Sequence, residues 1–198
     1  MKDMAPYLGT ECQEILTDQP DQYAWLLEYC QEYLPKKQVR LYQDTRISLQ
    51  TLYALDTKLQ DALSPRVWLK SGAYLVIEPT EALTVIDVNS GKWERKTNAQ
   101  DTYFQINLEA AREIALQLRL RNLSGIILVD FINMVKDDHI LELMESLRTL
   151  VKTDPITTSI IDMTPLGLVE ITRKKVSKPL HEQIHLSRSQ QSHETDQI

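Results

Sequence analysis

The sequence contains no apolar run that approaches the ~20 residues an α-helix needs to cross a bilayer. Its first residues, Met1 to Pro6, include no apolar core of the kind that a secretory signal peptide requires. We therefore expect a cytoplasmic protein with no membrane segment. An apolar content of 42% in 198 residues is sufficient for a real hydrophobic core, in one large domain or one and a half small ones.

Cysteine is scarce, and Cys12 and Cys30 are too far apart to form a CxxC motif. In a cytosolic chain we expect both thiols to be reduced and structural. His181 and His185 have the spacing of half a helical metal site. Their polar surroundings and the lack of a nearby cysteine favour a solvated tail instead.

Glycine is also scarce. With 5 glycines in the whole chain, the sequence has no glycine-rich loop that could cradle a phosphate group. No nucleophile pattern is present either. Both absences argue against a generic magnesium phosphohydrolase that acts on small phosphate esters.

Positive charge is in deficit, since the formal net charge is −6 and the pI is near 5.3. A module that binds nucleic acid only by neutralising phosphates is expected to be basic. The acidic balance therefore excludes an unspecialised RNA-binding module more strongly than it excludes a metal-dependent nuclease, whose site needs carboxylates.

The first third of the chain shows two helical patterns and one strand pattern. Aromatic and apolar residues at helical spacing predict a helix over 21–33, and residues 39–42 predict a short strand. Leucines on one stripe predict a single amphipathic helix over 48–62. Residues 1–19 show no strong periodicity. We interpret 1–65 as a small segment of helix, strand and helix.

The rest of the chain alternates strand and helix patterns. Closely spaced apolar runs at 67–69, 74–77 and 83–87 predict an antiparallel meander. Thr102 with Gln105 fits a capping box, which predicts a helix that starts there and continues to about Arg121. Further elements are expected as a strand at 125–129, a helix at 137–151, and strands near 157–162 and 167–172.

Together these patterns predict a layered α/β domain over 66–180, with helices on a mixed sheet. The continuous apolar run from Gly125 to Val129 is typical of a strand that is covered on both faces. Residues 181–198 are polar, and we expect a disordered tail there.

Two aspartates end apolar strands. Asp130 follows the apolar run 126–129, where an unpaired carboxylate needs a cation or strong donors, although capping of a loop amide explains it equally well. Asp87 ends a similar strand, and Asn89 points to the same face if the backbone stays extended.

Neighbouring strands lie ~4.8 Å apart, so Asp87 and Asp130 can share one ion if their strands pair. If the strands do not pair, they are two unrelated turn carboxylates. A small set of oxygen ligands suits Mg²⁺, for which Mn²⁺ can substitute.

Other polar residues surround this predicted site. Asn107 is in phase with the apolar face of its helix, so we expect it to support the structure by contacting the turn at 89–91. Glu109 and Arg112 are expected to form a solvated pair. Two basic clusters could contact phosphates, although a solvated face is the ordinary interpretation of their lysines. The clusters contain Lys92, Arg95 and Lys96, and Arg173, Lys174, Lys175 and Lys178.

Several blocks of this sequence resemble, in order and spacing, the RNase E/G family of endoribonucleases. Together they cover most of residues 66–180, and residues 38–65 resemble the preceding family segment more weakly. The blocks are Thr80–Gly91, Asn107–Ala111, Ile114–Ala115, Gln117–Arg121, Gly125–Met134 and Gly167–Arg173.

The resemblance implies a DNase I-like subdomain over 66–180, preceded by a remnant of an RNase H-like subdomain. It implies that Asp87 and Asp130 bind magnesium and that Asn89 helps to position the attacking water. The implied reaction is hydrolysis of single-stranded RNA to 5′-phosphate and 3′-hydroxyl ends, in RNA processing and decay. The metal would acidify a bound water and neutralise charge on the scissile phosphate, and the asparagine would hold the angle of attack.

Two departures from the family matter. Family members are longer, and nothing in this sequence corresponds to their N-terminal oligonucleotide-binding barrel or to their pocket for the 5′ end of the substrate. We therefore expect weak activity in isolation, and the acidic balance is explained. The zinc-linking CPxC motif is absent at 177–180, so we expect no zinc site, and any homodimer would form through the α/β domain. The alternative function is a non-catalytic scaffold or oligomerisation module of a ribonuclease assembly.

Overall fold

The structure is a computed structural model that describes residues 12–91 and 99–185. The chain divides into two compact units, Met1–Gln60 and Asp61–Ile198, a few residues before the division that the sequence suggested. None of the helices in the described ranges combines the length and the apolar composition needed to cross a membrane.

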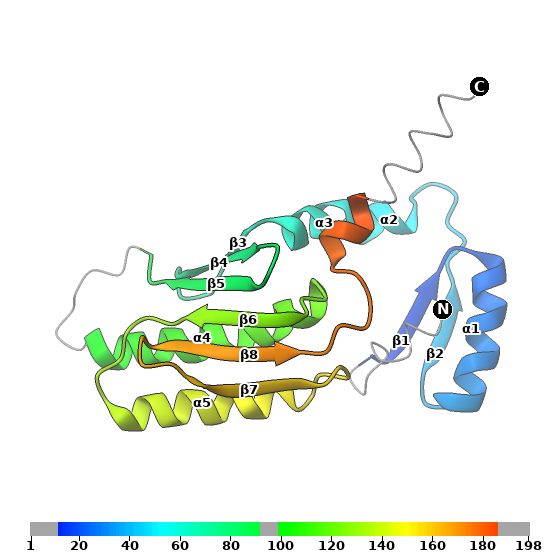
Figure 1. The fold of residues 1–198 in the computed structure, drawn as a ribbon. Helices are drawn as coiled ribbons and strands as arrows, with labels where there is room; N and C mark the ends of the chain where they lie inside the picture. Colours follow the sequence, from blue (N-terminus) through cyan, green and yellow to red (C-terminus); the bar gives the residue numbers. More distant parts are fainter. Residues whose placement is uncertain (1–11, 92–98, 186–198) are drawn as a thin grey trace. The chain divides into compact units, whose positions relative to one another are not determined.

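The first unit contains a two-stranded parallel sheet and the helix that connects its strands. Ile15, Leu26 and Cys30 form its small core. The helix and the second strand confirm the prediction, whereas the first strand falls in a region where we saw no periodicity. A four-residue strand with only two inward positions is too short to show a period. The elements are β1 (Glu14–Thr17), α1 (Pro20–Tyr33) and β2 (Gln38–Leu41) (Figure 1).

The single helix predicted over 48–62 is wrong, because the structure has two helices there, α2 (Leu49–Leu52) and α3 (Leu55–Leu63). Ser48 caps α2 by accepting a hydrogen bond from the backbone N–H of Thr51 at 3.1 Å. Ala54 breaks the stripe with a φ of 48°, in the left-handed region. The leucine spacing continues across this break, so periodicity alone does not reveal it.

The second unit is built on a six-stranded mixed sheet, which confirms the α/β fold class. Its strand order is β3-β4-β5-β6-β8-β7, and the β3-β4-β5 meander is antiparallel as predicted. β5 and β6 are parallel, whereas β8 is antiparallel to both of its neighbours. The strands are β3 (Arg66–Trp68), β4 (Tyr74–Pro79), β5 (Thr84–Asn89), β6 (Gly125–Asp130), β7 (Thr158–Met163) and β8 (Leu168–Arg173).

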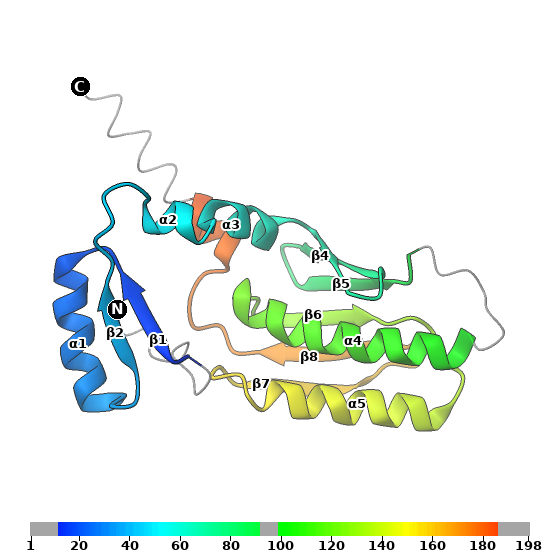
Figure 2. The same ribbon diagram turned by 180° about the vertical axis from the view of Figure 1, so that it is seen from behind.

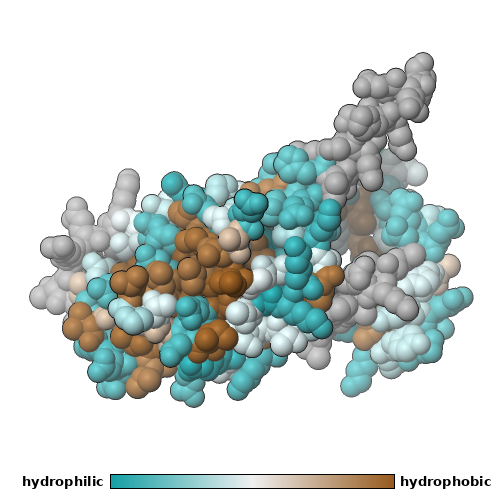
Figure 3. Space-filling view, in the orientation of Figure 1, coloured by the Kyte–Doolittle hydropathy of each residue, from teal (hydrophilic) through white to brown (hydrophobic). Residues whose placement is uncertain are grey.

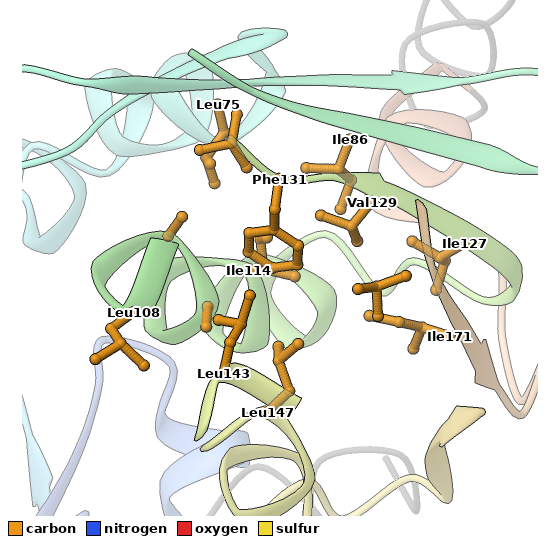
Figure 4. Packing of buried hydrophobic residues seen from close by; sticks show 14 of the residues in the cluster. Leu75, Ile86, Leu108, Ile114, Ile127, Val129, Phe131, Leu143, Leu147 and Ile171 are labelled. Carbon is orange, nitrogen blue, oxygen red and sulfur yellow. The ribbon is translucent and has the colours of Figure 1, made fainter. Parts of the chain in front are cut away.

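Two helices, α4 (Ala99–Leu120) and α5 (Asp137–Val151), pack on the same face of this sheet (Figures 1 and 2). The core lies between the two layers, where strand residues meet helix residues. Figure 4 shows this packing: Leu75, Ile86, Ile127, Val129 and Ile171 come from the sheet, and Leu108, Ile114, Leu143 and Leu147 come from the helices.

The opposite face of the sheet is open, which corrects the expectation that β6 is covered on both sides. Ile127 and Val129 are fully buried, but Ile126 is 52% exposed. Because both helices pack on one face, the alternate residues of every strand face outward. Figure 3 shows apolar side chains gathered on the outer surface above the strands. Val85 on β5 and Ile161 on β7 alternate with buried residues and are exposed, as Ile126 is.

Helix ends differ from the prediction at two places. α4 begins at Ala99, so Thr102 lies within its first turn and does not cap it. Residues 181–185, where we expected the disordered tail to begin, are helical and continue from Leu180. The backbone N–H of Leu180 donates to the carbonyl of Arg121 at 2.9 Å. The remainder of that predicted tail lies outside the described residues.

A buried ion pair closes one end of the core. Arg173 ends β8 with a fully buried side chain, and its Nε donates to Oδ2 of Asp154 at 2.7 Å. Its other nitrogens donate to Asn122 Oδ1 at 3.0 Å and to the carbonyl of Leu123 at 2.9 Å. Burial acts to raise the pKa of Asp154, but hydrogen bonds from Arg173 and from the N–H of Ile156 outweigh it and lower this pKa below 3.8.

We expect Asp154→Asn to lower the free energy of unfolding at pH 7 by about 3–5 kcal/mol, because it leaves the Arg173 charge buried without a counter-charge. The folded-state pKa of Asp154 is depressed, so its contribution is present above pH 3.8 and is lost as pH falls through the folded-state value. Urea unfolding followed by circular dichroism at pH 7 and at lower pH measures this. Glu145→Gln, at an exposed carboxylate of α5, should change stability little at either pH; equal losses in both variants would contradict the assignment.

Candidate active site

The two aspartates that the sequence singled out are direct neighbours in the sheet. Asp87 on β5 and Asp130 on β6 are paired positions of a parallel ladder. β5 and β6 are parallel because α4 lies between them and returns the chain to the same end of the sheet. Paired residues point to the same face, and neighbouring strands lie about 4.8 Å apart. The two strands therefore pair, which is the condition on which a shared ion depends.

Both carboxylates lie on the open face, on the side of the sheet away from the buried core. Asp87 is half-buried and Asp130 is exposed, so the argument that Asp130 is costly to leave unpaired among apolar residues is wrong. Within residues 12–91 and 99–185, neither carboxylate forms an ion pair with a lysine, arginine or histidine. Two adjacent negative charges without a basic partner favour a bound cation.

Asn89 is tied to the first aspartate. Its Nδ2 donates to Oδ2 of Asp87 at 2.7 Å, two residues away on the same face. Two residues later, Gly91 has a φ of 67°, and a Cβ at this position would lie 2.5 Å from the carbonyl oxygen of Gly72. Only glycine fits such a close backbone approach. The turn that follows β5 is thus held against the β3–β4 turn, and Asn89 is well placed to orient Asp87.

Asn107 supports the site at a different place from the one we predicted. Its side chain is fully buried, but its partners are not in the 89–91 turn. Nδ2 donates to the carbonyl of Ile132 at 2.7 Å, and the N–H of Ile132 donates to Oδ1 at 3.1 Å. The side-chain amide of Asn107 therefore bonds to both backbone groups of Ile132, as a neighbouring strand would, two residues after Asp130.

Glu109 does not form the solvated pair with Arg112 that we expected. Its carboxylate accepts hydrogen bonds from the backbone N–H of Ser71 at 3.2 and 3.4 Å, whereas Arg112 is exposed. α4 therefore anchors the β3–β4 turn through Glu109 and the segment after β6 through Asn107. The spacing of the sequence placed Asn107 and Glu109 on this helix but could not show which loops their side chains contact.

The basic cluster that follows β8 does not lie where we expected phosphate contacts. Arg173 pairs with Gly125, at the opposite end of β6 from Asp130, which is about 17 Å along the strand. Since Arg173 is also buried in its ion pair, the prediction that it binds RNA beside the metal is wrong. Lys174 is exposed but follows Arg173 at the same distant end. Lys92, Arg95 and Lys96 lie outside the described residues.

Sequence reasoning did not find a pocket beside Asp130. It has a volume of about 500 Å³ and is lined by residues 130–134, by residues 163–167 at the β7–β8 turn, and by Ile140. The turn at 163–167 carries Pro165 and Gly167, which mark it as a turn, but only the antiparallel ladder of β6 and β8 brings it next to Asp130.

The donor set suits a hydrated magnesium ion. In the described part of the chain, no group of three or more acidic, histidine or cysteine side chains could hold a metal. Mg²⁺, however, is commonly bound by one or two carboxylates and completes its shell with water and substrate phosphate. Two carboxylates on an open face, with an amide bonded to one of them, fit that requirement.

The chain is similar to known ribonucleases over most of its length. The model of the Ribonuclease E/G family matches residues 2–176. Ribonuclease G of Salmonella typhimurium is 41% identical over 85% of the chain, and Ribonuclease G of Escherichia coli K12 is 40% identical over 88%. Ribonuclease E of Synechocystis is 46% identical over 69%. The chain spans 35%, 36% and 20% of these three proteins, respectively.

The mixed sheet and its helices make the second unit an α/β protein, with two paired carboxylates on neighbouring parallel strands. With the family match across nearly the whole described chain, the chain belongs to the Ribonuclease E/G family.

We expect Asn107→Leu to lower the free energy of unfolding by about 1–3 kcal/mol, because it leaves the half-buried N–H and C=O of Ile132 without their side-chain partner. Amide hydrogen exchange should accelerate most at Ile132 and its neighbours. Gln105→Leu, an exposed position on the same helix, is the matched control. Unchanged exchange at Ile132 in the Asn107 variant would show that the bridge does not order this segment.

Proposed function

We propose that this chain carries the metal-binding catalytic part of an endoribonuclease that hydrolyses single-stranded RNA to 5′-phosphate and 3′-hydroxyl ends. The observation that carries the proposal is the in-register pairing of Asp87 with Asp130 on one open face. Membership of the Ribonuclease E/G family and the names of the similar proteins support it. Its role would be in cytoplasmic RNA processing and decay.

Asp87 and Asp130 would hold one Mg²⁺, for which Mn²⁺ can substitute. When bound, the ion lowers the pKa of a coordinated water and neutralises charge that develops on the scissile phosphate. Asn89 holds the Asp87 carboxylate through its Nδ2, and its carboxamide oxygen can accept a hydrogen bond from the attacking water. The open face gives a single strand access to the carboxylates on the central strands β5 and β6, and activity is expected to be weak in the isolated chain.

We expect Asp87→Asn and Asp130→Asn each to lower kcat/KM on a single-stranded oligoribonucleotide by about a hundredfold or more, because each removes a ligand of the ion. Cleavage is measured in Mg²⁺ with mass analysis of the product ends, and Mn²⁺ binding is followed in parallel by electron paramagnetic resonance. Glu142→Gln, an exposed carboxylate of α5, should retain both properties. If the wild-type chain cleaves and both aspartate variants cleave equally well, the site is misassigned.

A second proposal is that the chain acts as an oligomerisation module through its α/β unit. The observation that favours it is the exposed apolar side chains on the open face, among them Val85, Ile126 and Ile161. An apolar surface of this kind commonly marks a protein contact. A non-catalytic assembly role would require a stable oligomer and no magnesium-dependent cleavage.

We expect Ile126→Lys to shift a homodimer toward monomer by at least tenfold in dissociation constant, because a charge would be buried in an apolar contact. Light scattering after size-exclusion chromatography measures the mass. Leu120→Lys is the control, since Leu120 is exposed to nearly the same extent, 49% against 52%, but lies on α4. Equal masses for all three chains would exclude this contact.

A further inference from the structure

Three side chains at the edge of the sheet form a cluster that neither the core nor the candidate metal site uses. Trp68 on β3 is 63% exposed, and its ring lies 5.1 Å from that of Tyr74 on β4. The guanidinium of Arg66 lies 4.6 Å from the Tyr74 ring and 5.7 Å from the Trp68 ring. We call these three residues the aromatic cluster. A tryptophan this exposed adds little to the stability of a core.

The register of the sheet places this cluster beside the candidate site. Trp68 pairs with Tyr74, and Tyr74 pairs with Asn89. Paired residues share a face, so these three side chains form one row across the open face. Two strand spacings, about 10 Å, separate the strand of Trp68 from that of Asn89.

Arg66 begins the neighbouring row. It pairs with Val76, which pairs with Asp87, and Asp87 pairs with Asp130. The cation at the edge and the two carboxylates therefore lie on the same face of the sheet. Among the residues that the structure describes, Arg66 is in no salt bridge, and its recorded side-chain contacts are with the two rings. Its N–H groups thus stay available to a phosphate.

The chemistry of this cluster matches one nucleotide. An exposed indole offers a flat surface on which any base can stack, and a guanidinium that lies on aromatic rings offers charge to the adjoining phosphate. The chain is acidic and two carboxylates lie nearby, so a nucleic acid can bind here only where a cation meets its phosphate. Arg66 supplies it beside the ring.

We propose that Trp68, with Tyr74 and Arg66, forms a stacking subsite for a base of single-stranded RNA close to the scissile phosphate. This inference rests on the proposed nuclease function and adds a residue that determines how the substrate is seated. The subsite accepts any base, because stacking is tolerant of sequence. Trp68 acts by positioning the strand and takes no part in bond cleavage.

The test uses the full chain and a 2′-O-methyl oligoribonucleotide, which cannot be cleaved, in the absence of divalent ions. Trp25 and Trp93 are replaced by phenylalanine, so that Trp68 is the remaining tryptophan and can be excited selectively over the tyrosines. We expect the oligonucleotide to quench Trp68 emission. Trp68→Ala in the otherwise wild-type chain should raise Kd, measured by fluorescence anisotropy of a labelled strand, by about tenfold to hundredfold. Trp68→Phe should restore most of the affinity.

The matched control is Tyr33→Ala, which removes an aromatic ring that is 60% exposed and packs on Tyr29 at 5.0 Å. It should leave Kd unchanged. An abasic nucleotide scanned along the labelled strand should weaken binding to the wild-type chain at one position and have no further effect on Trp68→Ala. In cleavage assays, Trp68→Ala should raise KM and leave kcat within about twofold.

The outcomes separate this proposal from the proposed function. Quenching and loss of affinity in a chain that does not cleave RNA support the subsite and overturn the nuclease assignment. Cleavage in which Trp68→Ala keeps the wild-type Kd and KM overturns the subsite and leaves the nuclease assignment standing. A change of oligomeric state in Trp68→Ala, with no quenching in the single-tryptophan chain, overturns it in favour of a protein contact. Circular dichroism verifies that each variant is folded.

Discussion

The parallel pairing of β5 with β6 is the constraint on which the candidate site depends. It is held by the core, where Ile86, Ile127 and Val129 pack against α4 with essentially no exposed surface. A slip of one residue along either strand would move these side chains to the open face and would also turn Asp87 and Asp130 away from each other. The apolar core therefore specifies the position of two carboxylates that it does not touch. The same strand register is therefore needed for a stable core and for the pairing of the two carboxylates.

Because α4 and α5 cover the same face, all the outward positions of the sheet are left for function. Along this face the two carboxylates, the amide of Asn89 and the aromatic cluster follow one another by strand pairing. α4 then holds the surrounding loops with polar groups: Asn107 bridges the backbone after Asp130, and Glu109 accepts the N–H of Ser71 in the β3–β4 turn. A rigid helix that anchors two loops keeps them in place without a second layer of structure on the open side.

The buried ion pair of Arg173 with Asp154 has a structural role and lies far from the candidate site. Arg173 forms its ion pair at the opposite end of β6 from Asp130, where it joins β8 to the segments that precede β6 and β7. Among the residues that the structure describes, Arg66 is the cation linked to the carboxylates by strand pairing, and it is exposed and stacked on aromatic rings. Solvent exposure lets such a cation exchange water for phosphate at little cost, whereas a buried guanidinium would first have to leave its partner. Under the proposed function, this exposed cation is how an acidic chain would receive RNA at this face.

The sequence alone determined the α/β class and most of the strands and helices of the second unit, because alternating and helical apolar periods report directly which residues are buried. Its apolar runs also drew attention to the aspartates Asp87 and Asp130. It also carried the family relationship. The tertiary structure alone decided that Asp87 and Asp130 are neighbours, that Asn107 bonds to Ile132, and that Arg173 is buried. Each of these depends on which strands pair and on which face the helices cover, and a linear pattern holds no record of either. The break at Ala54 and the open side of β6 were invisible for the same reason: a periodic stripe shows that a residue is apolar and not whether anything covers it.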